Sequence, residues 1–233
     1  MYERFFKRVF DFCLSLAALI VLSPLMLVLT ACGAVAMRGN PFFAQPRPGK
    51  IDAQTGKERI FKLIKFRTMS NARDKDGNLL PDADRLNCYG KFLRATSLDE
   101  LPELINIVCG DLAVVGPRPF LVRDMVFMDK RQRSRHSVRP GLTGLAQISG
   151  RNNISWEQKI EYDLEYIDKG ITLVNDFKII LLTVGKVLRR SDIVRDGTES
   201  DVDFGDYLLE KNVITKEFYD ERQAEARALL GVG

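Results

Sequence analysis

The longest apolar stretch of the chain lies near its beginning, where residues 12–37 contain no charged side chain. An uncharged run of this length is long enough to form a membrane helix. No small-residue cleavage site follows it, so the pattern favours a retained anchor over a signal peptide.

A Ser23-Pro24 pair stands at the centre of this stretch, and proline there predicts a kink. Each half reaches only about 18–20 Å at about 1.5 Å per residue. The hydrocarbon core of a bilayer is roughly 30 Å thick, so neither half spans it alone. Cations flank the stretch on both sides, which favours two cytoplasmic ends. They are Arg4, Lys7 and Arg8 before it and Arg38, Arg47 and Lys50 after it.

This pattern favours a re-entrant membrane helix in residues 1–39, broken at Ser23-Pro24. A kinked helix that spans the bilayer is the alternative. Beyond residue 40 the chain alternates short strand-like and helical stretches, as in α/β domains. We expect such a domain over residues 40–195.

Within that domain, residues 60–69 are rich in aromatic and β-branched side chains and predict a strand. Residues 111–115 predict a second short strand, which runs into the sequence GPRP. Residues 139–144, with the sequence RPGLTG, predict a turn.

Two amphipathic helices follow. Ser155 and Gln158 fit a capping box before apolar positions at helical spacing. A further apolar stripe over residues 173–188 has a basic end, which is typical of a helix in the membrane interface, although packing in a soluble core explains the stripe too. Residues 196–206 predict an acidic linker. The rest of the 196–233 tail predicts two short helices around Asn212.

Composition narrows the chemistry. The net charge is +4, and neither a zinc pattern nor an RNP-type aromatic motif is present, so we expect no nucleic acid partner. The four cysteines form no CxxC pair, as in reduced thiols that face a cytosol. The single histidine, His136, disfavours a Ser-His-Asp triad and a His-based metal site. Carboxylates, Lys and Arg must therefore carry any catalysis, with a metal where one is needed.

The candidate catalytic residues are the adjacent Asp99 and Glu100, which begin an apolar helical pattern. A structural role is the alternative, because Ser97 and Glu100 fit a capping box. That alternative puts Pro102 at the fifth helical position, where proline is costly. A helix that starts at Asp99 leaves Glu100 free. In both cases the carboxylates lie in a first turn whose amides attract phosphate.

Several cations are candidate phosphate ligands. Lys65 and Arg67 alternate on the predicted strand and so face the same way. Arg94 lies five residues before Asp99, and Arg118 is held between two prolines. Arg139 opens the second Gly- and Pro-rich turn. For any single arginine, a solvated surface role is the alternative.

Three long motifs give the chain a specific resemblance. KFRTM, RATSLDELPELINIVCGDLAVVGPRP and RPGLTGLAQISGRN resemble the bacterial sugar transferase family, the monotopic phosphoglycosyl transferases. The resemblance covers about residues 1–190 and leaves the tail unexplained. It implies a compact monotopic α/β membrane domain, with a re-entrant helix and a catalytic domain at the cytoplasmic face of the bacterial inner membrane.

The same resemblance implies a reaction. A sugar-1-phosphate would pass from a UDP-sugar to undecaprenyl phosphate by a magnesium-dependent ping-pong mechanism, as the first membrane step of O-antigen, capsule or glycoconjugate assembly. Asp99 would be the nucleophile, Glu100 would hold Mg²⁺, and Lys65, Arg94 and Arg118 would contact phosphate. Partners would include membrane lipid, a second copy of the chain or downstream glycosyltransferases. A membrane-tethered nucleotide-sugar pyrophosphatase and a non-catalytic interaction module are the rival functions. No residue indicates which sugar is used.

Overall fold

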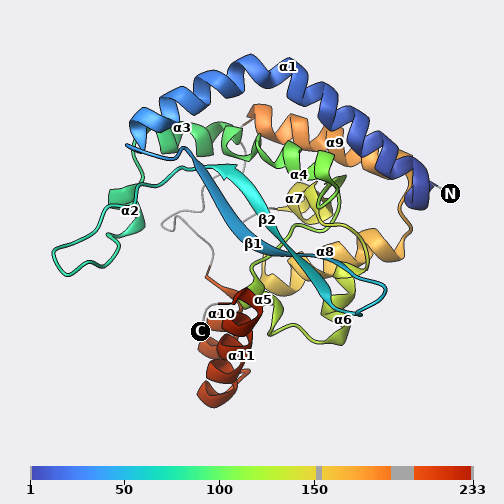
Figure 1. The fold of residues 1–233 in the computed structure, drawn as a ribbon. Helices are drawn as coiled ribbons and strands as arrows, with labels where there is room; N and C mark the ends of the chain where they lie inside the picture. The colour runs from blue at the N-terminus through green and yellow to red at the C-terminus, as the bar shows by residue number, and fades with distance from the viewer. Residues whose placement is uncertain (1, 151–153, 190–201, 232–233) are drawn as a thin grey trace.

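An arched helix forms one side of the molecule. The computed structural model describes residues 2–150, 154–189 and 202–231. A short π-helical turn, η1 (Tyr2–Phe6), leads into α1 (Lys7–Ala36), which curves over the rest of the fold in Figure 1. Along α1 most exposed side chains are apolar: Ile20 is 66% exposed and Val35 is 80% exposed. A helix this long and apolar can cross a membrane by length and composition, and its exposed apolar surface indicates a membrane-bound protein.

The helix continues through Pro24 without interruption. Proline has no N–H to donate to the carbonyl four residues earlier, which is that of Ile20. The Ser23 hydroxyl donates to this same Ile20 oxygen at 2.8 Å. The Ser23 hydroxyl thus replaces the N–H that Pro24 lacks as a donor to the Ile20 carbonyl, and the helix curves without ending.

A twisted hairpin connects α1 to the rest of the domain. β1 (Phe42–Ile51) pairs with β2 (Glu58–Phe66) in antiparallel register, with Phe43 opposite Lys65 and Arg47 opposite Phe61. The strand predicted at 60–69 is confirmed as β2. Strand β1 was missed because it contains two prolines, which cannot donate to a ladder and are tolerated on edge strands.

Short helices and one further sheet follow the hairpin. The helices are α2 (Asp82–Arg85), α3 (Cys88–Thr96), η2 (Leu98–Glu100), α4 (Glu103–Cys109), α5 (Val122–Met125), α6 (Lys130–Arg133), η3 (Ser134–Ser137) and α7 (Leu145–Ser149). β3 (Ala113–Val115) pairs in parallel with β4 (Gly141–Thr143). The strand expected at 111–115 is confirmed. The RPGLTG segment was predicted to be wholly a turn, but half of it forms β4.

Two glycines allow these segments to approach closely. A Cβ at Gly141 would lie 2.1 Å from the backbone nitrogen of Gly116, and a Cβ at Gly116 would lie 2.6 Å from the Arg139 carbonyl. Any side chain here would push the GPRP loop away from β4. The glycines therefore fix the position of the loop that carries Arg118.

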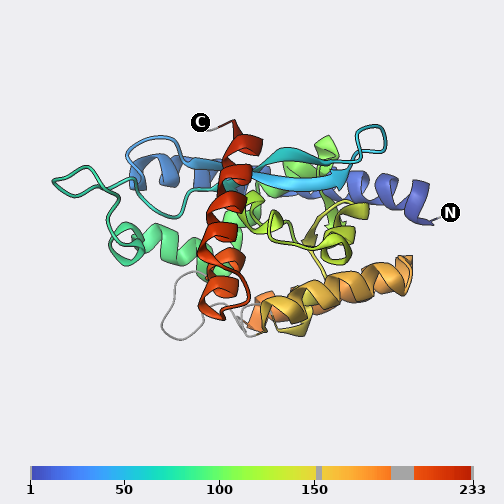
Figure 2. The same cartoon turned by 90° about the horizontal axis from the view of Figure 1, so that it is seen from below.

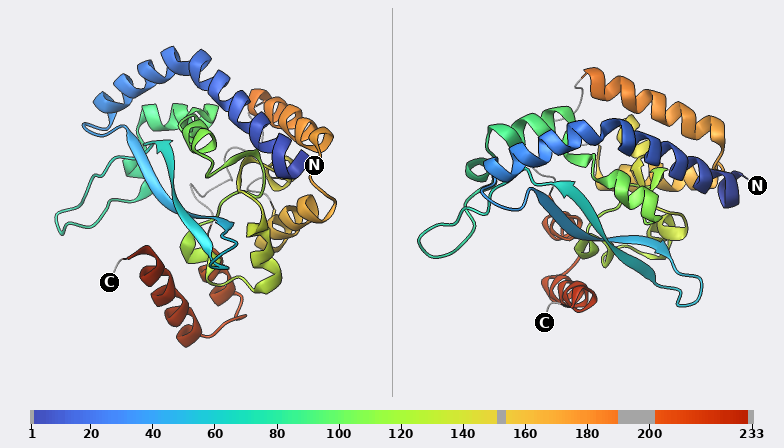
Figure 3. Two further views of the ribbon diagram at one scale, coloured as in Figure 1. Left: turned by 45° about the vertical axis from the view of Figure 1, so that its right-hand side comes forward. Right: turned by 45° about the horizontal axis from the view of Figure 1, so that its top comes forward.

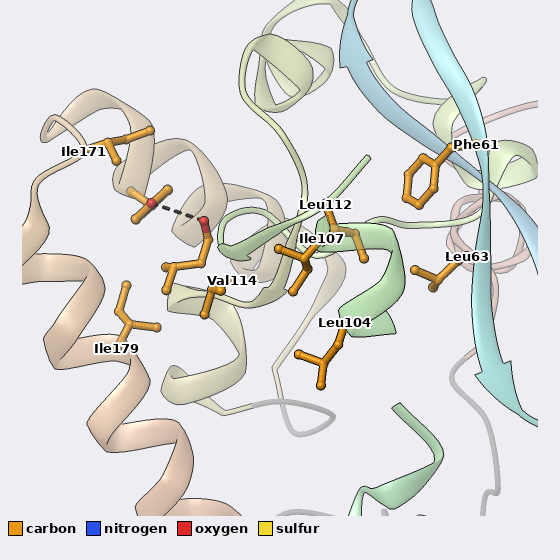
Figure 4. Close-up of a cluster of buried hydrophobic side chains, with 10 residues drawn as sticks. Phe61, Leu63, Leu104, Ile107, Leu112, Val114, Ile171 and Ile179 are labelled. Carbon is orange, nitrogen blue, oxygen red and sulfur yellow. Dashed lines mark hydrogen bonds between the residues drawn. The ribbon is translucent and has the colours of Figure 1, made fainter. Parts of the chain in front are cut away.

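A central hydrophobic core holds the hairpin to the helices. Figure 4 shows apolar side chains from β2, α4 and β3 converging with side chains near α9. They are Phe61, Leu63, Leu104, Ile107, Leu112, Val114, Ile171 and Ile179. α8 (Trp156–Asp168) begins with the expected Ser155–Gln158 capping box, which is confirmed.

α9 (Leu173–Arg189) leaves much of its apolar face in solvent. Phe177, for example, is 55% exposed, and Val174 and Leu181 are exposed too. Figures 1 and 3 place α9 on the same side of the domain as α1. Both α1 and α9 therefore expose apolar side chains on this side of the domain.

The tail forms the two predicted helices, α10 (Phe204–Glu210) and α11 (Lys216–Leu230), with Asn212 between them in a left-handed conformation. Figure 2 shows α11 lying across the domain. Phe204 and Ala226 are buried in a second core with α5 and α8. Most of the expected linker, 196–201, lies outside the described residues.

Candidate active site

The turn that carries Asp99 and Glu100 is set by its neighbours. Ser97 ends α3 in a left-handed conformation, with φ 55°, and its side chain caps no helix. The capping-box interpretation is therefore wrong, and so is a helix that starts at Asp99. Leu98–Glu100 is a 3₁₀ turn, and α4 begins only at Glu103. Pro102 immediately precedes α4, where its missing N–H costs nothing.

Glu100 is held by two cations. Lys65 Nζ lies 3.0 Å from Oε1, and the Arg118 guanidinium engages both carboxylate oxygens, with Nη1 3.4 Å from Oε2. Burial raises the pKa of Glu100, but the charge of Arg118 and then that of Lys65 outweigh it and hold the pKa well below its usual range. Glu100 is thus an ionised carboxylate.

Asp99 has the opposite electrostatic environment. Burial, followed by the negative charge of Glu100, raises its pKa from 3.8 to about 6, while Lys65 and Arg118 oppose the rise. Two adjacent carboxylates are therefore pushed to different pKa values, a pattern found at catalytic sites.

A third carboxylate was missed by the sequence analysis. Glu103 is fully buried, and Lys65 Nζ lies 3.1 Å from its Oε1. Both of its oxygens are shielded from solvent, and the Lys65 ammonium is their ion-pair partner. Burial raises its pKa, and the charge of Lys65 opposes that rise. Its spacing of three residues from Glu100 was the signal that could have revealed it.

Arg118 is positioned by a buried ion pair. Its Nη1 donates to the Leu142 carbonyl at 2.9 Å, and its own carbonyl accepts from Arg135 Nη2 at 2.5 Å. Arg135 is buried against Asp163 of α8, with Nε 3.1 Å from Oδ2, and stacks on Phe120. Arg135 and Asp163 are 17 and 45 positions away from Arg118 in sequence, so no local motif indicated that they position it.

Of the other cations predicted to bind phosphate, Arg94 and Arg67 lie on the segments that flank the site, and Arg139 does not. Arg94 lies in the last turn of α3, just before the Asp99 turn, with Nε 3.2 Å from Thr68 Oγ1. Arg67 directly follows β2, and its amide bonds the Pro41 carbonyl. Arg139 lies elsewhere. It donates to the carbonyl of Gly110, which ends α4 about 10 Å along the axis from Glu103.

The acidic residues suit magnesium. Among the described residues, no three His, Cys, Asp or Glu side chains are grouped to hold a metal. Mg²⁺ needs no such cage, because it is usually bound by one or two carboxylates together with water and substrate phosphates. Glu100, with Asp99 beside it, provides hard oxygen ligands of this kind.

The membrane helix is built into the domain through buried polar contacts. Asp176 of α9 accepts from Lys7 Nζ at 2.6 Å, from Tyr2 at 2.8 Å and from Tyr166 at 2.7 Å. Asp11 accepts from the Val114 amide of β3 at 3.2 Å. Lys7, counted above as a flanking cation, is buried and belongs to this network.

The family follows from a direct comparison. The family model for bacterial sugar transferases matches residues 2–190. The chain therefore belongs to the bacterial sugar transferase family.

Curated relatives agree with this. The chain is 46% identical over 182 residues to EpsL of Bacillus subtilis (strain 168), described as an uncharacterised sugar transferase, with 78% of this chain and 87% of the relative covered. It is 40% identical to the UDP-glucose:undecaprenyl-phosphate glucose-1-phosphate transferase of Klebsiella pneumoniae, covering 78% of this chain and 40% of the relative. It is 35% identical to the undecaprenyl-phosphate galactose phosphotransferase of Salmonella typhimurium, covering 81% and 41%.

The chain thus spans most of EpsL but well under half of the two longer relatives. The Klebsiella and Salmonella relatives are named as enzymes that transfer a sugar phosphate to undecaprenyl phosphate, and these names define the enzyme class. The chain is a phosphoglycosyl transferase.

Proposed function

We propose that this chain transfers a sugar-1-phosphate from a UDP-sugar to undecaprenyl phosphate, giving polyprenyl-diphosphate sugar and UMP. The observation that carries the proposal is the pairing of Asp99, whose pKa is raised to about 6, with an ionised Glu100 clamped by Lys65 and Arg118. The substrates named for the Klebsiella and Salmonella relatives support the same reaction.

Asp99 is the proposed nucleophile. One of its carboxylate oxygens attacks the phosphorus that carries the sugar, the P–O bond to UMP breaks, and UMP leaves with the bonding electrons. An oxygen of undecaprenyl phosphate then attacks the same phosphorus and displaces Asp99. Lys65 and Arg118 stabilise the negative charge that develops on the transferred group.

Glu100, with Asp99 beside it, would hold Mg²⁺ together with substrate phosphate oxygens. When bound, the ion supplies positive charge that offsets the repulsion between a carboxylate and an anionic diphosphate. Arg94, which precedes the Asp99 turn, and Arg67 are proposed to contribute further positive charge toward the phosphates.

The second substrate, undecaprenyl phosphate, is a membrane lipid, so the active site must lie at the membrane surface. A re-entrant α1 and an interfacial α9 would place Asp99 at the level of lipid headgroups, on the cytoplasmic face of the inner membrane. The product would be the first lipid-linked intermediate in the assembly of a surface polysaccharide. The exopolysaccharide production protein ExoY of Sinorhizobium fredii, 35% identical over 198 residues, supports this setting.

UMP release with and without lipid tests the proposal. Detergent-solubilised protein with Mg²⁺ and a panel of UDP-sugars should release at most about one UMP per active site without lipid, and should turn over when undecaprenyl phosphate is added. Mass spectrometry of the lipid-free reaction should find a phosphosugar on Asp99. Continuous UMP release without lipid would identify a pyrophosphatase. Release of no UMP with any UDP-sugar would favour a non-catalytic module.

A further inference from the structure

The inner face of the β1–β2 hairpin carries a cation that the proposed reaction has not yet used. Residues opposite one another in an antiparallel pair share a face, and so do residues two apart. Gln45 and Arg47 therefore lie on the face of Lys65, Leu63 and Phe61, and the last two are buried in the core. The sequence analysis counted Arg47 as a membrane-flanking charge, and the structure adds that its side chain packs into the domain.

Every acceptor that Arg47 contacts is neutral. Its Nη1 donates to the Pro119 carbonyl at 3.0 Å and its Nη2 donates to Gln45 Oε1 at 2.7 Å. Its Nε is buried, and no hydrogen-bond partner for it exists among the described residues. Buried arginines are normally paired with carboxylates, because an uncompensated charge away from water is costly.

The charged groups around Arg47 do not supply the carboxylate partner that it lacks. Burial and then the positive charge of Arg118 lower the pKa of Arg47 to about 10, while Asp124 and Glu103 oppose the shift and Arg123 adds to it. Asp124 is already engaged by the amides of Leu121 and Phe204, at 3.1 and 3.0 Å. Asp203, on which the charge of Arg47 also acts, is already paired with Arg123 at 2.6 Å. Among the described residues, Arg118 therefore has a carboxylate partner and Arg47 has none.

Arg47 contacts the loop that carries Arg118, at a point of the hairpin removed from Lys65. Lys65, which contacts Glu100, is opposite Phe43, and Arg47 is four residues further along β1, about 14 Å at about 3.4 Å per residue. Pro119, whose carbonyl Arg47 bonds, directly follows Arg118. Arg47 therefore lies beside the loop that carries Arg118, and further along the hairpin than Lys65.

We propose that Arg47 is a substrate-binding residue that receives the phosphate of the leaving nucleotide, while Lys65 and Arg118 serve the phosphorus attacked by Asp99. This inference rests on the proposed function, because that reaction releases UMP. Each Nη of Arg47 carries a second N–H besides the one that it donates to Pro119 or Gln45, and arginine binds a phosphate group through more than one N–H.

Binding of UMP, compared with uridine, tests the assignment. Isothermal titration calorimetry on the detergent-solubilised full chain would compare the wild type with Arg47→Gln, Arg47→Lys and Lys62→Gln. Lys62 is the matched control, since it lies on the same hairpin and is exposed. Arg47→Gln should weaken UMP binding about tenfold or more, as expected for loss of a charge-assisted hydrogen bond, and leave uridine binding unchanged. Arg47→Lys should fall between, and Lys62→Gln should match the wild type.

Other outcomes overturn the inference. Unchanged UMP affinity in Arg47→Gln removes Arg47 from the site, and the proposed transfer survives if the wild type still turns over. Equal loss of UMP and uridine binding in both Arg47 variants, with a lower melting temperature, makes Arg47 structural. A wild-type protein that binds no UMP counts against the proposed function itself.

Discussion

The guanidinium of Arg118 grips Glu100 through both carboxylate oxygens. Lys65 reaches the same carboxylate from β2, so segments from three parts of the chain meet at one side chain. The adjacent Asp99 keeps a raised pKa, because burial and then the negative charge of Glu100 outweigh the effect of the two cations. The site thus stabilises one carboxylate at the expense of its neighbour.

Replacing Arg118 should disable the site and leave the fold intact. Arg118→Ala removes the largest positive charge effect on Glu100, so the pKa of Glu100 should rise and turnover should fall about 10²–10³-fold, the usual range for loss of a preorganised charge. Steady-state UMP release measures this, and circular dichroism checks the fold. Arg118→Lys, which keeps the charge, should retain more activity than Arg118→Ala. Activity within twofold of the wild type would count against the role.

Asp99→Asn should abolish the covalent adduct and also raise the melting temperature. The folded-state pKa of Asp99 lies above its unfolded value, so the protonated form is favoured by folding and the ionised form is destabilising at neutral pH. A neutral amide removes that cost. Differential scanning fluorimetry at about pH 7.5 and again at about pH 4 should show a gain that shrinks in acid. A lower melting temperature at neutral pH would contradict the electrostatic account.

The rate of the lipid-free half-reaction should depend on Asp99 ionisation. Since the pKa is raised to about 6, the carboxylate becomes protonated as the pH falls through that value, and a protonated carboxyl is a poor nucleophile. Single-turnover UMP release measured from about pH 5 to about pH 8 should therefore rise through about pH 6 and then level off. A flat profile across this range would show that Asp99 does not limit the step.

Ser23 and Pro24 should act together on the shape of α1. Ser23→Ala leaves the Ile20 carbonyl without its hydroxyl donor, while Pro24→Ala restores the backbone donor and should straighten the helix. Cysteine accessibility at both ends of α1 in intact cells reports topology. The wild type should be labelled only from the cytoplasm, and Pro24→Ala should shift part of the population toward spanning. Periplasmic labelling of the wild-type N-terminus would reject the re-entrant arrangement.

Local patterns predicted those parts of the protein that local chemistry determines. The apolar stretch, the Ser155 capping box and the two tail helices were each predictable from neighbouring residues, and the structure confirms them. The motif containing Asp99, Glu100 and Arg118 indicated the site. That Arg118 reaches Glu100 is a property of the folded chain.

Long-range effects explain the rest. Pro46 and Pro48 argued against a strand at β1. An edge strand tolerates proline, but the strand that pairs with β1 lies beyond Gly56 and is not part of the local pattern. The sequence around Ser97 resembles a helix N-cap, but in the structure Ser97 has a left-handed backbone conformation and ends α3. Arg47 resembled a surface charge because only the hairpin register turns it inward.

The contacts of Lys7 and Asp11 with α9 and β3 have a practical consequence. Removing residues 1–39 would not yield a water-soluble catalytic domain, because Asp176 would lose its cation and the Val114 amide its acceptor. The depth at which α1 settles in a bilayer is therefore also the depth at which the domain settles. Anchor and domain form one folded unit, so in the proposed reaction the bilayer that holds α1 would also set how far Asp99 lies from the lipid substrate.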